Sequence, residues 1–465
     1  MKRQILQNLL RWKEDPNRQP LLIRGVRQCG KTWIMKKFGE ENYPDTAYFN
    51  FESDERLMEF FEGDLDVSRI IKSLGVQRGK MIMPGTTLVI FDEIQFCPRA
   101  LTSLKYFCED MPKLHVLCAG SLLGVALAKP QSSQGRPLLN ASVDISSLSA
   151  FPVGKVELLT LRPMNFFEFC IANGEEMLAD HLTSLAVSEP LPEAFTSRLK
   201  EYYRDYLICG GMPAVVSSWI DKHDIGEVER IQQQILDTYA LDFVKHAPLN
   251  DFPKLSLIWH AIPLQLAKEN SKFLFSQVKK GARARDLEDA LQWLIDAGLI
   301  YKAEKVDRPY IPLSMYADAS YFKIYLADVG LLRKMSKFPA SALLSSSPLA
   351  ADMRGALTEN YVLSEVMSVT GDVPYFWRSE RIAEVDFLVQ DGGEVVPIEV
   401  KAGKNTRAKS LQEYRKKFSP GISVRVSLQA AARHDDEYGT LLEMPLYLVW
   451  MWKTYLDAVH RPSDI

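Results

Sequence analysis

Gly25-Val26-Arg27-Gln28-Cys29-Gly30-Lys31-Thr32 is the stretch that decides the fold of the first part of the chain, because it fits the pattern G-x-x-x-x-G-K-[ST]. The apolar run 20–23 precedes it, and residues 33–38 follow it with apolar and basic side chains at helical spacing. The two glycines allow backbone N–H groups to surround phosphate oxygens, Lys31 offers a positive charge to the β- and γ-phosphates, and Thr32 offers a hydroxyl to Mg²⁺. The stretch therefore predicts a strand, a phosphate-binding loop and a helix, with Trp33 as the last residue of the nucleotide-binding segment.

A second apolar strand, Thr87–Phe91, ends in the two carboxylates Asp92 and Glu93. Downstream of a phosphate-binding loop, this arrangement predicts that Asp92 and Thr32 hold the Mg²⁺ shell and that Glu93 polarises the attacking water. Phosphoryl transfer depends on positioning and charge stabilisation more than on covalent chemistry, so a lysine, a metal and a water-activating carboxylate are its essential parts. Lys31 and Glu93 are therefore the predicted catalytic residues of a site for ATP and Mg²⁺.

The composition limits the classes of protein to which the chain can belong. Its 465 residues suffice for two or three domains, and a hydrophobic content of 47% supports globular cores. The net charge of −3 excludes a surface that binds polyanions throughout, although local basic patches are compatible with it. The six cysteines include no C-x-x-C pair, which predicts reduced thiols in a cytoplasmic protein without zinc or disulfides. We expect neither a signal peptide nor a membrane-spanning helix, because polar residues interrupt the apolar runs.

Apolar segments alternate with helical patterns over the first third of the chain, which predicts an α/β domain with a parallel, doubly wound sheet. The expected strands are 21–23, 47–51, 88–91, 116–119 and 156–161. Ser121 follows the fourth strand at the edge of the sheet where ligands bind, so it is a candidate catalytic sensor of the γ-phosphate. The alternative role of Ser121 is an ordinary helix N-cap, and the two roles are compatible.

These motifs, with Ala119-Gly120-Ser121 and Leu161-Arg162-Pro163-Met164-Asn165-Phe166-Phe167-Glu168-Phe169, resemble the prokaryotic AAA-type ATPases related to the STAND and archaeal ATPase group. The resemblance implies a P-loop AAA-type ATPase core over residues 1–163, a helical lid over 164–250 and a winged-helix-like domain over 251–335. It also implies a C-terminal domain with a restriction-endonuclease-like core. Arg136 and Arg162 are arginines that could reach a neighbour's nucleotide in a homo-oligomer, but nothing in the sequence selects either as an arginine finger. The alternative role of each is a solvated surface arginine.

The segment Lys254–Leu332 resembles a winged helix-turn-helix, with residues 284–294 as its recognition-type helix and a wing strand that starts at Gly298. Positive charges that could contact nucleic-acid phosphates gather near the start of this helix: Lys268, Lys272, Lys279, Lys280, Arg283 and Arg285. Acidic residues on the same helix would repel DNA: Asp286, Glu288 and Asp289. DNA binding and a structural role of this helix are both open from the sequence.

A second group of chemically suggestive residues follows the serine-rich stretch Ser341–Ser347, which we expect to be a linker. Strand patterns flank Asp391-Gly392-Gly393-Glu394, a typical hairpin signal. A two-residue turn at the glycines would place Asp386 opposite Glu399 and Glu384 opposite Lys401, all on one face of the hairpin. Two facing carboxylates repel each other unless a cation lies between them, so this register predicts a divalent metal site beside a lysine.

Asp386 followed by Glu399-x-Lys401 resembles the PD-(D/E)xK nuclease superfamily. The resemblance implies a nuclease-like domain over residues 350–465, in which Asp386, Glu399 and the helical Glu359 bind Mg²⁺ and Lys401 orients or activates the attacking water. We therefore expect an ATP-hydrolysing protein with a nuclease-like domain that processes DNA or RNA, with defence or mobile-element biology as its setting. The alternative is an ATP-dependent regulatory switch whose nuclease-like domain is a non-catalytic binding module.

Overall fold

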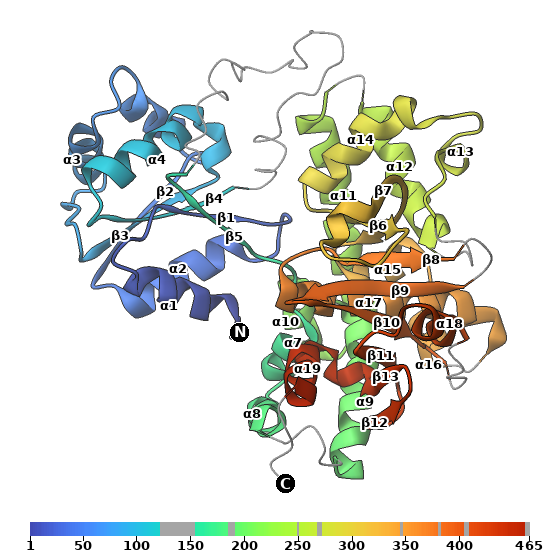
Figure 1. Cartoon of the computed structure of the whole chain (residues 1–465). Helices are drawn as coiled ribbons and strands as arrows, with labels where there is room; N and C mark the ends of the chain where they lie inside the picture. The colour runs from blue at the N-terminus through green and yellow to red at the C-terminus, as the bar shows by residue number, and fades with distance from the viewer. Residues whose placement is uncertain are drawn as a thin grey trace.

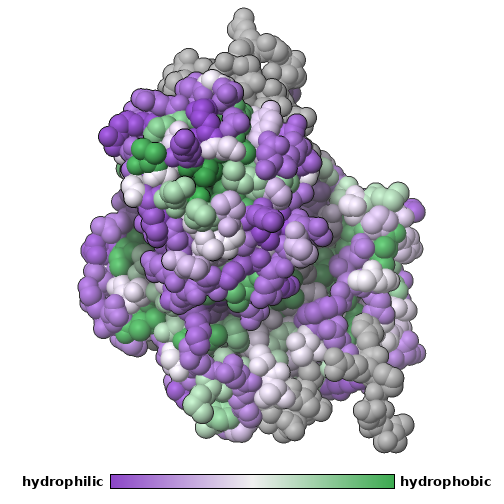
Figure 2. All heavy atoms as spheres, turned by 90° about the vertical axis from the view of Figure 1, so that its left-hand side faces the viewer, coloured by the Kyte–Doolittle hydropathy of each residue, from purple (hydrophilic) through white to green (hydrophobic). Residues whose placement is uncertain are grey.

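The computed structural model of the chain describes residues 1–120, 154–184, 191–248, 251–266, 272–344, 347–379, 383–403 and 409–460. Figure 1 shows a parallel sheet with its helices on the left and a larger mixed sheet surrounded by helices on the right. Figure 2 shows the face of the parallel-sheet unit, on which hydrophilic residues predominate and hydrophobic residues form smaller groups. Among the described residues, no helix has both the length and the apolar character that crossing a membrane requires.

The parallel sheet has the strand order β2-β3-β4-β1-β5, and every neighbouring pair of its strands is parallel. Its strands are β1 (Leu21–Arg24), β2 (Asp45–Asn50), β3 (Thr87–Asp92), β4 (His115–Ala119) and β5 (Glu157–Thr160). The helices of this unit within the described residues are α1 (Ile5–Glu14), α2 (Lys31–Asn42), α3 (Val67–Gln77) and α4 (Pro98–Asp110), with short 3-10 turns η1 (Glu55–Phe61) and η2 (Ile94–Phe96). The predicted parallel α/β fold and its strands are confirmed.

Helices cover both faces of the parallel sheet, which explains why its strands are apolar over most of their length. Side chains alternate between the two faces, so Leu22 and Phe91 belong to the buried cluster that includes α3 and α4. Ile23 and Ile90 belong to the cluster that includes α1 and α2. β1, β4 and β3 are neighbours and run in parallel, so their carboxyl ends lie at the same edge of the sheet. The loop after β1 and the carboxylates at the end of β3 therefore meet at this edge.

Helices form the next part of the chain. They are α7 (Phe166–Ala172), α8 (Glu176–Ser184), α9 (Glu193–Cys209), α10 (Pro213–Lys222) and α11 (Ile225–His246). Asn165 caps α7, because its side chain accepts a hydrogen bond from the Glu168 N–H at 2.9 Å and the Glu168 carboxylate accepts one from the Asn165 N–H at 3.3 Å. The same carboxylate pairs with the buried Arg3 at 3.0 Å, which ties α7 to the start of the chain.

The mixed sheet has the order β12-β13-β11-β10-β9-β8-β6-β7. Its strands are β6 (Ile300–Val306), β7 (Ala317–Leu326), β8 (Tyr375–Arg378), β9 (Glu384–Asp391), β10 (Glu394–Val400), β11 (Ile422–Ser427), β12 (Ala432–Asp436) and β13 (Gly439–Pro445). The accompanying helices are α12 (Phe252–Leu266), α13 (Phe275–Val278), α14 (Ala284–Asp296), α15 (Val329–Met335), α16 (Ala340–Leu344), α17 (Ala351–Thr370), α18 (Lys409–Phe418) and α19 (Trp452–His460), with the 3-10 turns η3 (Leu313–Tyr316), η4 (Pro348–Ala350) and η5 (Leu446–Met451).

The expected wing strand is β6, and it forms an antiparallel hairpin with β7. On its other side β6 pairs in parallel with β8, so one sheet takes strands from both of the segments predicted as separate domains, 251–335 and 350–465. The expected serine-rich linker lies between them and contains the end of α16. The boundaries of these domains stay a prediction, but the sheet itself is continuous across the linker.

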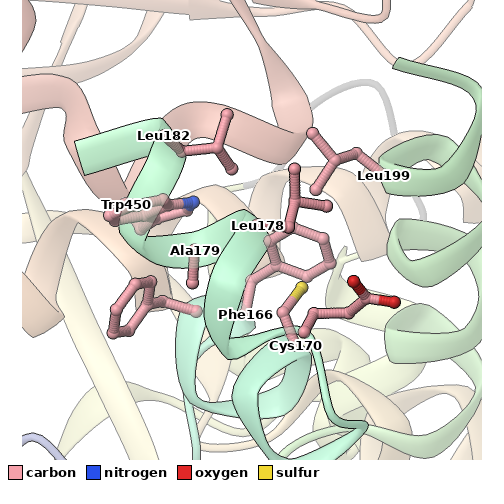
Figure 3. A pocket seen from close by; sticks show the side chains of 9 residues that line it. Phe166, Cys170, Leu178, Ala179, Leu182, Leu199 and Trp450 are labelled. Carbon is pink, nitrogen blue, oxygen red and sulfur yellow. The ribbon is translucent and has the colours of Figure 1, made fainter. Parts of the chain in front are cut away.

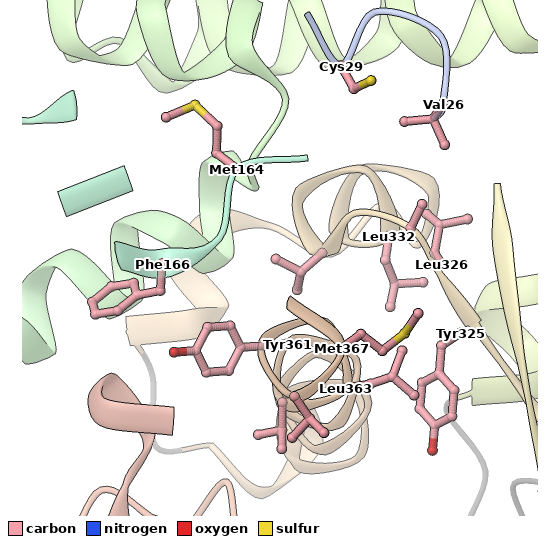
Figure 4. Packing of buried hydrophobic residues seen from close by; sticks show 14 of the residues in the cluster. Val26, Cys29, Met164, Phe166, Tyr325, Leu326, Leu332, Tyr361, Leu363 and Met367 are labelled. Atoms are coloured by element: carbon pink, nitrogen blue, oxygen red, sulfur yellow. The ribbon is translucent and has the colours of Figure 1, made fainter. Parts of the chain in front are cut away.

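α17 lies in the interior of the second unit and is buried on most of its surface. Tyr361 and Leu363 are fully buried, and Met367 is nearly so. Figure 4 shows these side chains in the same buried cluster as Phe166 of α7 and Tyr325 of β7. A helix that is surrounded by other elements needs apolar residues on nearly all sides. A charged side chain on α17 therefore requires partners inside the protein.

Candidate functional site

The loop Gly25–Thr32 connects β1 to α2, as the sequence predicts. Gly30 has a φ of +98°, a left-handed conformation that favours glycine, and Gln28 has a φ of +66°. α2 begins at Lys31 and is 12 residues long, so the positive end of its dipole faces the loop. The loop and the start of the helix together form a site that is suited to an anionic group such as phosphate.

Lys31 is buried with 5% of its surface exposed, although it carries a charge. Its ammonium donates hydrogen bonds to the carbonyl oxygens of Gly25 at 2.8 Å and of Val26 at 2.9 Å. A buried ammonium group requires such partners, because its desolvation is otherwise very costly. The side chain is therefore held inside the predicted phosphate site instead of extending into solvent.

Asp92, at the end of β3, reaches the start of α2. Its Oδ2 accepts hydrogen bonds from Thr32 Oγ1 at 2.7 Å and from the Tyr48 hydroxyl at 2.8 Å. Burial, together with the carboxylate of Asp92, raises the pKa of Tyr48 to about 12, so the phenol remains a donor at neutral pH. The structure thus brings together Thr32 and Asp92, the two predicted Mg²⁺ ligands of the ATP site. The structure also adds Tyr48 to the site, a residue that was not predicted. Its position near the carboxyl end of β2 was the sequence signal that could have identified it.

Glu93 follows β3 directly and has a φ of +51°. Its N–H donates a hydrogen bond to Asp92 Oδ1 at 3.1 Å, and its Oε2 accepts one from Gln95 Nε2 at 2.5 Å. A non-glycine residue in this conformation stores about 1–3 kcal/mol of strain and is typical of functional positions. The contacts fix Glu93 beside Asp92, where the sequence predicts a water-activating carboxylate.

Gly25→Ala is expected to deform the loop. An ideal Cβ at this position would lie 2.1 Å from the carbonyl oxygen of Leu161 and 3.2 Å from the sulfur of Cys29, so the backbone must move. We expect a loss of about 1–3 kcal/mol in the free energy of unfolding. We also expect at least about tenfold weaker binding of a non-hydrolysable ATP analogue in calorimetry.

The matched control for this variant is Gly355→Ala in α17, because an added Cβ there meets no atom within 4 Å. That control should bind the analogue as the wild type does. Wild-type affinity in Gly25→Ala would contradict the assignment of this loop to the nucleotide.

α11 contacts the phosphate-binding loop, which the sequence analysis does not predict. The Arg27 guanidinium forms an ion pair with Asp242, and the Tyr239 hydroxyl donates a hydrogen bond to the Arg27 carbonyl at 2.9 Å. Burial raises the pKa of Asp242, and the charge of Arg27 opposes this shift. The sequence signal for this contact was Asp242, an acidic residue on the buried side of α11. The helical pattern alone does not show that its partner is Arg27. The loop is therefore held by the helical part of the chain as well as by its own domain.

The candidate γ-phosphate sensor Ser121 and the arginine-finger candidate Arg136 lie outside the described residues. Arg162, the other arginine candidate, donates a hydrogen bond to the carbonyl oxygen of Gly371 at 2.6 Å. Trp33, the last residue of the predicted nucleotide segment, is exposed. The structure therefore leaves the roles of these residues as predictions.

The hairpin β9–β10 has the predicted register, with residues 387–391 paired to residues 394–398. From Ile398 onward β10 also pairs with β11. The described strands contain no ladder pairing of Glu384 with Lys401, because β10 ends at Val400. Glu384 forms an ion pair with the ammonium of Lys323 of β7 at 2.5 Å.

Asp386, Glu399 and Lys401 lie together in a partly buried cluster at the strand ends, in which Glu399 is the buried member. Asp386 Oδ2 accepts a hydrogen bond from the Val400 N–H at 2.7 Å, and Glu399 Oε1 pairs with the Lys401 ammonium at 2.5 Å. Burial raises the pKa of Glu399 to about 8, and repulsion from Asp386 adds to this shift. Burial also raises the pKa of Asp386, whereas the positive charges of Lys323 and Lys401 act to lower it.

Glu359 enters the cluster from α17, as the sequence predicts for the helical glutamate. Its carboxylate lies 3.9 Å from the Lys323 ammonium and accepts a hydrogen bond from the Tyr325 hydroxyl at 3.4 Å. Burial raises the pKa of Glu359 to about 7. Burial alone would lower the pKa of Lys323, but Tyr325, Glu384 and Glu359 raise it well above its ordinary value. Lys323 and Tyr325 are not among the predicted site residues, because both belong to β7, in the segment predicted as a separate domain.

In the part of the chain that the structure describes, no three His, Cys, Asp or Glu side chains lie close enough together to hold a metal ion. The predicted trio of Glu359, Asp386 and Glu399 is therefore not assembled as a preformed three-ligand site. A metal-binding role of these residues stays a prediction.

A small apolar cavity lies between α7, α8 and α9 (Figure 3). Its lining includes Phe166, Cys170, Leu178, Leu199 and Trp450. Its volume of about 10 Å³ corresponds to roughly one water position. The cavity is therefore a packing defect and too small for a substrate.

The predicted recognition-type helix coincides with α14. Its exposed side includes Arg285, Glu288 and Asp289, so charges of both signs face solvent. Its buried side contains Leu287 and Leu291, which pack in the main apolar cluster. Winged-helix character and DNA binding stay predictions for this segment.

Comparison with known families places a nucleotide-binding domain in the first part of the chain. Residues 17–170 match the family described as AAA domain. Residues 200–342 and 354–447 match two domains of unknown function, DUF8612 and DUF4143. No curated protein matches the chain in sequence.

Several solved structures are similar to parts of the chain. The Walker-type ATPase PABY2304 of Pyrococcus abyssi is 14% identical over 71% of this chain and 94% of that chain, with a TM-score of 0.44. PCH-2 of C. elegans is 11% identical over 47% of this chain and 60% of that chain, with a TM-score of 0.24. The Drosophila ORC bound to DNA is 12% identical over 71% of this chain and 93% of that chain, with a TM-score of 0.23.

The family match and the geometry of the site agree. The matched residues contain the strand, loop and helix around Gly25–Thr32 and the strand that ends at Asp92. The sheet that carries both elements is parallel. Residues 17–170 thus match the AAA domain family and carry a P-loop between a strand of a parallel sheet and a helix.

Proposed function

We propose that the chain hydrolyses ATP at the loop Gly25–Thr32 and that this activity is coupled to a metal-dependent nuclease in the C-terminal part. The observation that supports the ATPase site most directly is the 2.7 Å hydrogen bond between Thr32 Oγ1 and Asp92 Oδ2. It joins the end of the phosphate-binding loop to the carboxylate strand, which is the junction where the Mg²⁺ of a bound nucleotide is held in P-loop enzymes. DNA or RNA is the proposed substrate, and a homo-oligomer is the proposed assembly.

Each residue of the ATP site has a proposed role. Lys31 exchanges its carbonyl partners Gly25 and Val26 for oxygens of the β- and γ-phosphates. Thr32 and Asp92 hold the Mg²⁺ that accompanies ATP and neutralises charge on the phosphates. Glu93 accepts a hydrogen bond from the attacking water and orients it toward the γ-phosphate.

The C-terminal cluster has features that fit a divalent cation. Glu399 is 3% exposed, and its Oε2 has no hydrogen-bond partner among the described residues. A hard cation such as Mg²⁺ prefers carboxylate oxygens, and such an ion would satisfy this atom. Asp386 and Glu399 would hold the ion, which would stabilise charge on a phosphodiester, and Lys401 would orient the attacking water.

A regulatory switch with a non-catalytic C-terminal module is the second candidate. It is favoured by the two lysines, Lys323 and Lys401, that already neutralise carboxylates of the cluster. A cluster that is neutralised from within retains its structure without a metal. The two candidates differ in whether nucleic acid is cleaved, and a cleavage assay on the full chain separates them.

Glu399→Ala and Lys401→Ala are expected to abolish cleavage of nucleic acid for different reasons. Loss of Glu399 should weaken Mn²⁺ binding by at least about tenfold, because it removes a ligand. Loss of Lys401 should leave Mn²⁺ binding in place, because it removes only a neighbouring positive charge. Both variants should keep ATP turnover, since the ATP site lies on the other sheet.

The assay uses the full chain with single-stranded, double-stranded and branched substrates, with and without ATP and Mg²⁺. Glu175→Gln is the matched control, because Glu175 is a buried carboxylate that pairs with Arg198 of α9 and lies outside the mixed sheet. If the wild type cleaves none of these substrates, the regulatory switch replaces the nuclease as the function of this part.

A further inference from the structure

The carboxylate cluster of the mixed sheet contains an ammonium group on each side. Lys401 pairs with Glu399 at 2.5 Å, and Lys323 pairs with Glu384 at 2.5 Å. Asp386 Oδ2 accepts a hydrogen bond from the N–H of Val400, the residue between Glu399 and Lys401, at 2.7 Å. The charges of both lysines oppose the increase that burial imposes on the pKa of Asp386. The cluster therefore has two halves, and each half has its own internal cation.

Lys323 is a fixed part of the cluster. It is 1% exposed, and its ammonium lies 5.0 Å from the centre of the Phe376 ring. A buried ammonium is stable only when carboxylates compensate its charge, and here Glu384 and Glu359 provide that compensation. Glu359 thus has a cationic partner at 3.9 Å that is not part of the predicted motif.

Glu399 occupies the opposite half of the cluster and is incompletely satisfied. Lys401 contacts its Oε1, while its Oε2 is buried without a hydrogen-bond partner among the described residues. Buried polar atoms are normally satisfied, so an unpartnered carboxylate oxygen that faces other acidic groups indicates a missing ligand. A divalent cation beside Asp386 would supply it.

We infer that Lys323 is a built-in cation that replaces a second metal ion, so that the cluster holds a single divalent cation between Asp386 and Glu399. In this arrangement Glu359 is the partner of Lys323 and not a metal ligand. The inference rests on the metal-binding part of the proposed function and assigns a role to a residue outside the predicted motif. The site is composite, because Lys323 comes from β7 in the segment 200–342, and the carboxylates come from the segment 354–447.

The test is a calorimetric titration of the full, nucleotide-free chain with MnCl₂. Asp92→Asn serves as the background, because it removes the carboxylate of the ATP site. We expect the background to bind one Mn²⁺ per chain. The affinity of Glu359→Gln, and of the control Glu175→Gln, should stay within about threefold of this background. Glu399→Gln should lose at least about tenfold in affinity. Two ions per chain, or equal losses for Glu359→Gln and Glu399→Gln, would overturn the inference.

Lys323→Met provides a second, independent measurement. It leaves Glu359 and Glu384 without their cation, so the folded variant should bind two Mn²⁺ ions per chain and gain more in melting temperature from Mn²⁺ than the background does. A folded variant that still binds one ion contradicts the role of Lys323. If it does not fold, the comparison of Glu359→Gln with Glu399→Gln decides.

The outcomes also separate this inference from the proposed nuclease. A chain that binds one Mn²⁺ in the expected pattern but cleaves no nucleic acid contradicts the nuclease and supports the assignment of Lys323. A chain that binds no Mn²⁺ overturns both.

Discussion

Lys31→Ala is expected to abolish ATP hydrolysis, with turnover lower by about 100-fold or more. The side chain lies inside the loop, where its ammonium donates hydrogen bonds to the carbonyls of Gly25 and Val26. When a nucleotide binds, this ammonium is the positive charge that is available to the β- and γ-phosphates. The buried position also means that the variant leaves two carbonyls without a donor, which costs about 1–3 kcal/mol in the stability of the loop. Loss of turnover should therefore accompany a small decrease in melting temperature.

Phosphate release at saturating ATP is the measurement for this variant. Lys37→Ala is the matched control, because Lys37 lies on the same helix and its ammonium pairs with Glu41 at 2.5 Å on the exposed surface. It removes the same charge without touching the loop, so its turnover should equal that of the wild type. Wild-type turnover in Lys31→Ala would refute the ATP site.

The sequence predicted those parts of the molecule that depend on local spacing. The interval between Gly25 and Thr32 is short, and the glycines have the backbone conformations that the motif requires. The register of β9 and β10 was predictable for the same reason, because a two-residue turn fixes the pairing of both strands. Apolar runs likewise predicted the strands of the parallel sheet.

Contacts between distant segments were not predictable from spacing. Lys323 lies 36 residues before Glu359, and only the addition of the β6–β7 hairpin to the mixed sheet brings its ammonium to the carboxylates. The ion pair of Arg27 and Asp242 likewise depends on how α11 packs against the ATPase domain. A single-sequence pattern shows which face of a helix or strand is buried, but the partner of that face depends on the fold of the whole chain.

The metal site combines local spacing, which was predictable, with contacts between distant segments, which were not. The hairpin register correctly placed Asp386 near Glu399, whereas the third expected ligand, Glu359, was assigned by resemblance alone. In the structure Glu359 faces a lysine that the resemblance does not include. A site that takes residues from two segments is therefore predicted incompletely when only one segment is recognised.

Glu93→Gln is expected to retain ATP binding and to lose hydrolysis by about 10²–10⁴-fold. The amide has the shape of the carboxylate but lacks the negative charge that attracts a proton of the attacking water. The hydrogen bond from the Glu93 N–H to Asp92 Oδ1 at 3.1 Å comes from the backbone, so the substitution leaves it in place. Asp92 and Thr32 keep their contact as well, and the affinity for ATP should stay within about threefold of the wild type.

Binding and turnover must be measured on the same variant to separate these effects. Calorimetry with ATP and Mg²⁺ gives the affinity, and single-turnover phosphate release gives the rate of the chemical step. The exposed Glu55 offers a matched control, since Glu55→Gln makes the same chemical change on η1 and should leave both quantities unchanged. If Glu93→Gln hydrolyses ATP at the wild-type rate, another residue activates the water, and the strained backbone of Glu93 serves only to orient Asp92. If it loses binding together with turnover, the carboxylate acts on the nucleotide and not on the water.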